Sequence, residues 1–201
     1  MPLGDSITRG SHSTDTNGYR RPLYLKLQSD GHWVDFVGGL QDGITDFDRD
    51  HEGHSGWSAD GGSGGSIANS VFNFLTLKPA DIVLLHIGTN DIRDGHQNPA
   101  EVAKILDEIR RKSKDIQVVL ALIINQATPI PEVTLYNQQV RELALGRIAN
   151  GHALLLVDME NALSYPGDLH DSIHPNNSGY AKMANVWLKA LEGILPVCPP
   201  Q

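Results

Sequence analysis

The sequence has very little cysteine, no long apolar run and no excess of basic residues. Its single cysteine, Cys198, cannot form a disulfide within the chain and leaves the cellular compartment open. No apolar run approaches the roughly 20 residues of a membrane span, and no charged segment followed by an apolar one indicates a signal peptide. Lys and Arg number 16 against 24 Asp and Glu, a net charge of −8. We therefore expect neither nucleic acid nor a membrane as a partner.

What the chain does contain is enough apolar sequence for one packed domain. Its 201 residues are 40% hydrophobic and 20% charged, which is typical of a globular chain of this length. No internal repeat or linker divides the sequence. We expect a single domain over residues 1–195 and a loosely attached tail over residues 196–201.

Segments with the spacing of strands alternate with segments with the spacing of helices. Strands are expected at residues 1–3, 32–37, 81–87, 117–124 and 152–157. Helices are expected at residues 18–28, 66–75, 99–112, 131–148 and 176–191, the last capped by Asn176 or Asn177. Residues 38–65 are rich in Gly, Asp, His and Ser, and we expect them to form a long irregular segment with a functional role.

This alternation predicts an α/β fold of three layers (α/β/α), with helices on both faces of a central, mainly parallel sheet of about five strands. Functional sites in such sheets form at the carboxyl ends of the strands. Ser6, Asn90 and the segment after Val157 each come just past an expected strand. The sequence therefore places these three segments at one edge of the sheet.

The polar residues at these strand ends are the parts of a serine hydrolase. A serine hydroxyl such as that of Ser6 needs a neighbouring base, and His174 can take its proton near neutral pH. Asp171, three residues earlier, can hold the other ring nitrogen and stabilise the imidazolium. Asn90 offers an uncharged amide donor for a developing oxyanion. Alternatively, Asp171 and His174 are turn and cap residues before the last helix, and Asn90 is an ordinary loop asparagine.

A second serine competes for the role of nucleophile. Ser63, in the segment Gly61-Gly62-Ser63-Gly64-Gly65, matches the pattern G-x-S-x-G of a nucleophile elbow. That elbow requires a strand before the serine and a helix after it. A helix is expected after this segment, but the residues before it do not have the pattern of a strand. We therefore favour Ser6.

Four segments, in this order, resemble the SGNH, or GDSL-like, hydrolase superfamily. They are Gly4-Asp5-Ser6, Gly56, Gly88-Thr89-Asn90-Asp91, and Asp171 with His174. A closer similarity is to carbohydrate esterase family 3, the acetyl xylan esterases of that superfamily. It is carried by the segments MPLGDSIT (1–8), HEGHSGW (51–57) and DSIHP (171–175). The resemblance implies the flavodoxin-like sheet of the SGNH hydrolases.

The resemblance also implies roles for individual residues and a substrate. The oxyanion hole would consist of the N–H of Ser6, the N–H of Gly56 and the side-chain amide of Asn90. The activity implied is that of a serine esterase, which removes acetyl groups from carbohydrate, acetylated xylan in particular, through an acyl-enzyme on Ser6. No cofactor is implied. A secreted protein that acts as a monomer is expected.

Tryptophan and tyrosine residues are expected in two kinds of surroundings. Trp57 directly follows the glycine assigned to the oxyanion hole, and Tyr165 lies in the turn that leads to Asp171. Both are candidates to line the substrate site, with core packing as the alternative for Trp57. Trp33 and Trp187, in an apolar strand and helix, are expected in the core.

Two segments resemble metal-binding motifs without matching them fully. His51 and His54 are one residue too close for the zinc pattern H-E-x-x-H. The acidic residues at 46, 48 and 50 match the first ligands of a calcium loop, but later positions hold His51 and Trp57 instead of the required Gly and Glu. We expect no metal in the catalytic site, while a structural calcium in the acidic loop stays open.

Two other functions remain compatible with these motifs. One is a lipase or thioesterase of the same superfamily that acts on longer acyl chains. The other is a carbohydrate-binding module on a hydrolase scaffold that has lost its activity, which the complete set of catalytic parts disfavours.

Overall fold

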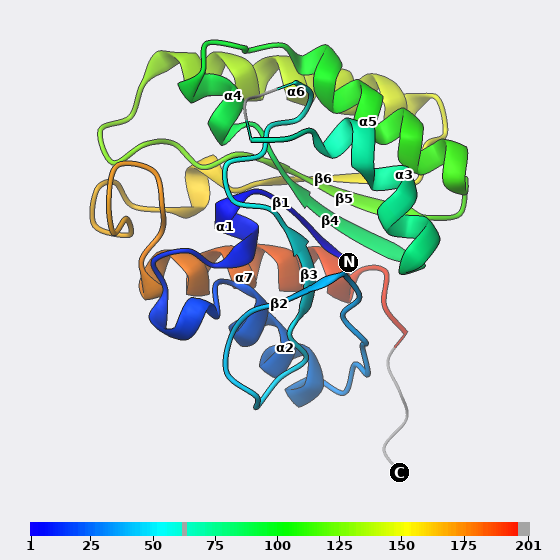
Figure 1. Ribbon diagram of the computed structural model, residues 1–201, viewed down its shortest axis with the longest axis vertical. Coiled ribbons are helices and arrows are strands. Elements are labelled where there is room, and N and C mark those ends of the chain that lie inside the picture. The colour runs from blue at the N-terminus through cyan, green and yellow to red at the C-terminus, as the bar shows by residue number, and fades with distance from the viewer. Residues whose placement is uncertain (62–63, 197–201) are drawn as a thin grey trace.

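The computed structural model describes residues 1–61 and 64–196, and its centre is a six-stranded sheet (Figure 1). The strands are β1 (Pro2–Gly4), β2 (Leu40–Gln41), β3 (Asp50–Gly53), β4 (Ile82–His86), β5 (Gln117–Leu122) and β6 (Leu154–Asp158). Their spatial order is β2-β3-β1-β4-β5-β6. Only β2 and β3 pair antiparallel, so the prediction of a mainly parallel sheet is confirmed.

Helices cover both faces of this sheet. They are α1 (Ser6–Arg9), α2 (Arg20–Ser29), α3 (Ile67–Leu77), α4 (Thr89–Arg93), α5 (Pro99–Lys112), α6 (Pro131–Ala149) and α7 (Asn177–Glu192). Short 3-10 turns occupy Thr14–Thr16 and Glu160–Ala162. Figure 1 shows α3, α5 and α6 over one face and α2 and α7 over the other, which is the expected three-layer order. No helix among the described residues is long and apolar enough to cross a bilayer.

The sheet separates two apolar cores, and alternate residues of its strands face each of them. In β5, Val118 and Leu120 pack with the core under α3, α5 and α6, whereas Val119 and Ala121 pack with the core under α2 and α7. A strand that is buried on both faces reads as a continuous apolar run. This explains why β4 and β5 could be predicted from hydropathy alone.

The structure corrects two expectations about the first third of the chain. Residues 32–37 were expected to form a strand, but they form none. Instead the backbone N–H of Phe36 donates to the carboxylate of Asp48 (2.7 Å). On one side of β1 the sheet continues through β3 and then β2, and both strands come from the segment 38–65, which was expected to be irregular. β3 has the polar sequence Asp-His-Glu-Gly, so its burial leaves no hydrophobic signal.

The prediction for Trp33 is also wrong, for a related reason. Its side chain was expected in the core, but the residue is 77% exposed. Because residues 32–37 are not part of the sheet, their alternation does not direct Trp33 inward. Trp187, on α7, is fully buried against Tyr19 as expected. Of the tail expected over residues 196–201, only Pro196 lies within the described part of the chain.

Candidate active site

Three of the expected segments follow three neighbouring strands, at the edge of the sheet where the carboxyl ends of these strands lie. Within the sheet, Gly4 of β1 pairs with Gly53 of β3 on one side and with His86 of β4 on the other. The loops that follow these strands carry Ser6, Gly56 and Asn90, so the strand order brings the three residues to the same edge.

Ser6 is held at the start of a helix directly after β1. A side chain at position 4 would place its Cβ 2.1 Å from the carbonyl oxygen of His86, so only glycine lets β1 approach β4 this closely. The carboxylate of Asp5 then caps the helix by accepting the N–H of Ile7 (2.9 Å). Ser6 is the first residue of α1, where a backbone N–H has no partner within the helix. The backbone N–H of Ser6 can therefore point at an anion.

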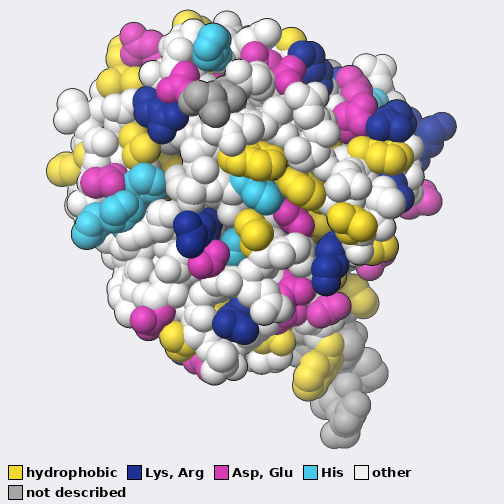
Figure 2. All heavy atoms as spheres, in the orientation of Figure 1, with side chains coloured by type: hydrophobic (Ala, Val, Ile, Leu, Met, Phe, Trp, Pro, Cys, Tyr) yellow, Lys and Arg dark blue, Asp and Glu magenta, His cyan; other side chains and the backbone are white. Residues whose placement is uncertain are grey.

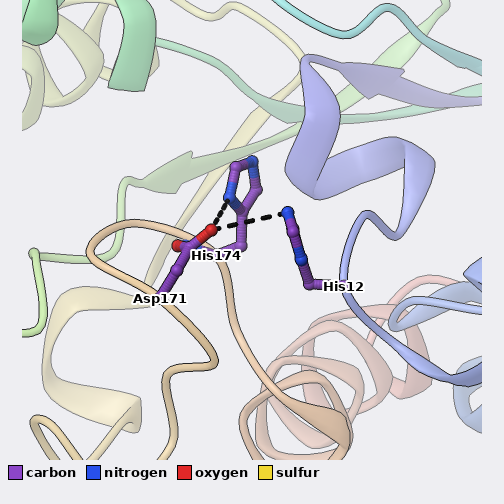
Figure 3. A group of neighbouring side chains, drawn as sticks. All are labelled: His12, Asp171 and His174. Atoms are coloured by element: carbon purple, nitrogen blue, oxygen red, sulfur yellow. Dashed lines mark hydrogen bonds and ion pairs between the residues drawn. The ribbon is translucent and has the colours of Figure 1, made fainter.

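The hydroxyl of Ser6 is one end of a chain of three side chains. Its Oγ lies 2.9 Å from Nε2 of His174, and Nδ1 of the same ring lies 2.9 Å from Oδ2 of Asp171. Figure 3 shows the carboxylate of Asp171 pointing at the His174 ring. Because Nδ1–H donates to the carboxylate, Nε2 is left as an acceptor for the serine proton. This is the geometry of a serine nucleophile with its general base.

Asp171 is fixed as an anion by the loop in which it lies. Burial by itself would raise the pKa of this carboxyl, but the backbone N–H groups of Ile173 and His174 and the His174 ring outweigh that effect and lower the pKa to about 2. Both backbone donors bond to Oδ1, at 2.9 and 2.8 Å. Oδ2 is therefore left for the histidine ring.

The loop that carries Asp171 and His174 must cross from β6, at the far edge of the sheet, to reach Ser6. It is attached on the way to the segment after β5, since Ala127 N–H donates to the Ser172 carbonyl (2.9 Å). Beyond His174, the side chain of Asn176 caps α7 by accepting the N–H of Gly179 (3.1 Å). The two attachments fix the loop that holds His174 beside Ser6.

Two of the expected oxyanion donors, Gly56 and Asn90, follow the strands that pair with β1 on either side. Gly56 has φ of +82° and faces open space, so its backbone can be approached without a side chain in the way. Asn90 is buried, and its Nδ2 donates to the Trp57 carbonyl (2.7 Å). That bond uses one of the two amide hydrogens and fixes the orientation of the side chain, so the second hydrogen is available to a ligand.

The sequence model of the GDSL-like lipase/acylhydrolase family matches residues 3–182 of this chain. The chain belongs to that family. Solved structures of carbohydrate esterases agree with this assignment: the family 3 carbohydrate esterase of Clostridium thermocellum is 30% identical, has a TM-score of 0.84 and covers 95% of this chain and 96% of its own. A family 3 carbohydrate esterase of Talaromyces cellulolyticus is 27% identical, with a TM-score of 0.82 over 96% and 95% of the two chains.

A curated protein is similar over nearly all of the chain. The multidomain esterase of Ruminococcus flavefaciens is 30% identical over 225 residues, which is 97% of this chain and 28% of that protein. This chain therefore spans less than a third of the length of that relative. The expected resemblance to GDSL-like hydrolases, and to carbohydrate esterase family 3 among them, is confirmed by these comparisons.

Within the family's fold, Asp91 has a role that motif reading did not assign. This buried carboxylate accepts the Ala59 N–H with both oxygens (3.0 and 3.1 Å). It therefore braces the loop that contains Gly56 against the segment that contains Asn90. Asp91 is the last residue of the segment Gly88-Thr89-Asn90-Asp91, but the sequence does not indicate that its partner is Ala59.

His12 is a second residue that sequence reasoning missed. Its Nε2 lies 3.4 Å from Oδ2 of Asp171, and its ring lies 4.7 Å, centre to centre, from the ring of His174. No motif contains it, because it belongs to the irregular segment after α1. Only the folded chain shows that it contacts the carboxylate of Asp171 (Figure 3).

The two residues expected to line the substrate site have different surroundings. Trp57 is half-buried and stacks on His54 (ring centres 4.2 Å apart), which itself stacks on Phe74. Tyr165 is also half-buried, but its hydroxyl accepts the Asn125 N–H (2.8 Å) and donates to the Glu160 carbonyl (2.9 Å). The structure therefore gives Tyr165 a bracing contact, while Trp57 lies next to the proposed oxyanion donor Gly56.

The competing nucleophile, Ser63, lies outside the described residues. Among the residues described before it, Ser58 forms an isolated bridge to Ser66, and no strand leads into this segment. The helix α3 does follow, as expected. An elbow would need both elements.

The acidic calcium-like segment is occupied by other interactions. The carboxylate of Asp46 bonds to Arg21, that of Asp48 accepts two backbone N–H groups, and that of Asp50 accepts the Gln41 amide. His51 and His54, the zinc-like pair, bond separately to Gly53 N–H and Glu52. None of these residues belongs to a group whose ligand atoms converge in the described part of the chain.

Proposed function

We propose that this chain is a serine esterase that removes acetyl groups from carbohydrate. The observation that carries the proposal is the continuous chain of contacts from Ser6 Oγ through His174 to Asp171, each 2.9 Å long. Membership of the GDSL-like lipase/acylhydrolase family supports hydrolysis of a carboxylic ester as the reaction.

In the proposed reaction, Ser6 Oγ attacks the ester carbonyl while its proton passes to Nε2 of His174. The negative charge that forms on the carbonyl oxygen is stabilised by the N–H of Ser6, the N–H of Gly56 and the amide of Asn90. Asp171 stabilises the resulting imidazolium through Nδ1–H. His174 then protonates the leaving alcohol, and a water activated by the same ring releases the acyl group. These steps use only side chains, backbone and water, and no cofactor.

The carbohydrate part of the proposal is supported by the structural comparisons. Two of the similar structures are family 3 carbohydrate esterases, and another is an acetyl esterase with acetate bound, 26% identical with a TM-score of 0.81. Within the site, Trp57 lies beside Gly56 and is only half-buried, so the exposed part of its ring can contact a sugar. We propose acetylated xylan as the substrate, and Trp57 and Tyr165 as residues that line the site.

The same proposal covers the setting in which the enzyme works. A polysaccharide substrate is too large to enter a cell, so we propose that the protein is secreted. All the proposed catalytic groups come from one chain, so we propose that it acts as a monomer, which size-exclusion chromatography with light scattering tests.

The direct test is release of acetate from acetylated xylan, run beside nitrophenyl esters from acetate to octanoate. We expect acetate release and a preference for the short esters. Replacement Ser6→Ala should lower kcat by about 10⁵–10⁶-fold, as in other serine hydrolases that lose the nucleophile, while Ser63→Ala should retain activity. Faster turnover of octanoate would indicate a lipase or thioesterase, and loss of activity in Ser63→Ala alone would overturn the assignment of Ser6.

A further inference from the structure

The carboxylate of Asp171 lies between two imidazole rings, of which the proposed hydrolysis uses one. Nδ1 of His174 is 2.9 Å from its Oδ2, and Nε2 of His12 is 3.4 Å from the same oxygen. Figure 3 shows both rings turned toward Asp171 from separate segments of the chain. His12 takes no part in the transfer of a proton from Ser6, so its place in this cluster is unexplained by the esterase reaction.

One ligand atom from each of His12, Asp171 and His174 lies within 4.8 Å of the other two. Across residues 1–61 and 64–196, this is the one group of His, Cys, Asp or Glu side chains that converges in this way. Two imidazoles and a carboxylate form a ligand set that zinc uses in proteins, with a water in the fourth position. We propose that these three residues bind a divalent transition metal such as Zn²⁺, and that the bound ion stops catalysis reversibly.

Two of the three distances between ligand atoms are close to those of a tetrahedral ion, and the third, between the His12 and His174 nitrogens, is up to 4.8 Å and has to approach the same value. Zinc lies about 2.0–2.1 Å from imidazole nitrogen and about 2.0–2.2 Å from carboxylate oxygen, so neighbouring ligand atoms are about 3.3–3.4 Å apart. The 3.4 Å between His12 Nε2 and Asp171 Oδ2 already has this value. The 2.9 Å between Asp171 Oδ2 and His174 Nδ1 must widen by a few tenths of an ångström. The side chains of His12 and Asp171 are 43% and 37% exposed, so water can complete the coordination.

His12 is positioned for this contact by a structured loop. Its φ is +65°, in the left-handed region that few side chains other than Asn, Asp and His adopt. Two residues later, the N–H of Thr14 donates to Asn177 Oδ1 (2.9 Å), and Asn177 Nδ2 donates to Thr14 Oγ1 (2.8 Å). This pair of bonds ties the loop to the first turn of α7, three residues after His174. The segments that carry the three ligands are therefore fixed relative to one another.

The chemical consequence of binding follows from the two ring nitrogens of His174. In the resting site Nδ1 carries the proton and Nε2 accepts from Ser6. A metal on Nδ1 requires that nitrogen's lone pair, so the ring proton moves through solvent to Nε2, with no net loss of charge from the ring. Nε2–H then donates to Ser6 Oγ and cannot accept its proton. The nucleophile is left without a base.

Metal binding is measured by calorimetric titration of the whole chain with Zn²⁺, and inhibition by hydrolysis of nitrophenyl acetate with and without Zn²⁺. The variant His12→Asn removes the ligand while keeping a residue that tolerates positive φ. His96→Ala removes an exposed histidine elsewhere and is the matched control. Loss of an outer hydrogen-bond partner of a metal ligand costs roughly 10–100-fold in metal affinity. Loss of the ligand itself should therefore weaken Zn²⁺ binding by at least this factor. The concentration of Zn²⁺ that halves activity should rise by the same factor.

We expect one Zn²⁺ per chain, inhibition that a chelator reverses, and unchanged binding in His96→Ala. Mg²⁺, which prefers oxygen ligands, should not inhibit at the same concentration. Absence of Zn²⁺ binding, or equal binding in wild type and His12→Asn, would overturn the inference. The inhibitory effect rests on the proposed function, but the titration does not. Binding that depends on His12 in a chain without esterase activity would support the metal site and overturn the esterase, whereas hydrolysis without such binding would do the reverse.

Discussion

The two carboxylate oxygens of Asp171 have different hydrogen-bond partners. One of its oxygens accepts two backbone N–H groups of its own turn, and the other faces the rings of His174 and His12. The spacing of three residues between Asp171 and His174 is what allows a turn to provide the backbone bonds and the ring contact together. A longer spacing would have required a different element to hold the carboxylate.

Asn90 provides the sharpest test of oxyanion stabilisation at the residue scale. The hydrogen bond from its uncharged amide is expected to be stronger to the oxyanion of the transition state than to the carbonyl oxygen of the ester. The replacement Asn90→Ala should therefore lower kcat by about 10²–10³-fold with little change in KM. Steady-state hydrolysis of nitrophenyl acetate measures this, with Asn73→Ala, an exposed position on α3, as the control. A kcat within a few-fold of wild type would exclude Asn90 from the oxyanion hole.

The carboxyl of Asp5, next to Ser6, gives a prediction about pH and stability. Burial, with a smaller contribution from Asp91, raises the pKa of Asp5 to about 7 from its ordinary 3.8. Between about pH 4 and pH 7 the folded chain keeps a proton that the unfolded chain releases, so this group lowers the free energy of unfolding as pH rises. Relative to wild type, Asp5→Asn should become steadily more stable across that range.

Urea unfolding at several pH values measures the difference. Asp46→Asn is a suitable control, because the hydrogen bond with Arg21 lowers the pKa of Asp46 below its ordinary 3.8. Its effect should change only below about pH 4, where the wild type loses the advantage of an ionised Asp46. A constant difference between wild type and Asp5→Asn from pH 4 to 7 would show that Asp5 is ionised in the folded chain.

At the scale of elements, the helices with local end signals could be predicted best. α5 begins and ends at the predicted residues because Asn98 caps it, Pro99 fits its first turn and its apolar residues recur with helical spacing. The strand β3 could not be predicted. Its four residues are polar and their burial depends on partners such as the Gly39 N–H, which donates to Glu52. Local sequence carries the first kind of information and not the second.

The cap of α7 is an element-scale feature with a measurable energy. Asn176 accepts the Gly179 N–H, and its Nδ2 also donates to the Gly167 carbonyl (2.8 Å). Replacement Asn176→Ala should lower the free energy of unfolding by about 1 kcal/mol, within the range of about 0.5–2 kcal/mol for such caps. Urea denaturation measures it. At Asn185, exposed in the middle of α7, the same replacement should be neutral or slightly stabilising, because alanine favours a helix. Equal effects at both positions would argue against the cap.

At the scale of the whole molecule, two tryptophans that both lie in apolar segments of the sequence differ in burial. Trp187, on α7, is fully buried against Tyr19, whereas Trp33 is 77% exposed. We expect Trp187→Ala to cost about 3–5 kcal/mol of unfolding free energy, because it leaves a cavity. Trp33→Ala should stay within about 0.5 kcal/mol of wild type. Chemical denaturation of the two variants compares them directly, and a cost above 2 kcal/mol for Trp33→Ala would place that ring in a packed site.

The surface of the molecule reflects its acidic composition. In the view of Figure 2, acidic side chains are distributed among Lys and Arg, without a continuous basic stripe. Several carboxylates are paired with arginine, including Asp42 with Arg9 and Asp107 with Arg147. Exposed pairs of this kind contribute little to stability, typically up to about 1 kcal/mol each. An uncharged substrate fits such a surface better than a polyanion.

The sequence by itself determined the three-layer α/β architecture and the residues that could form a serine hydrolase site. Hydropathy records which strands are buried on both faces, and short motifs carry the local geometry of a cap or of the Asp171–His174 turn. Tertiary structure alone decided that β3 adjoins β1, that Asp91 braces the loop containing Gly56, and that His12 contacts Asp171. These contacts join residues far apart in the chain, and they depend on strand order and loop closure, which no local pattern of side chains encodes.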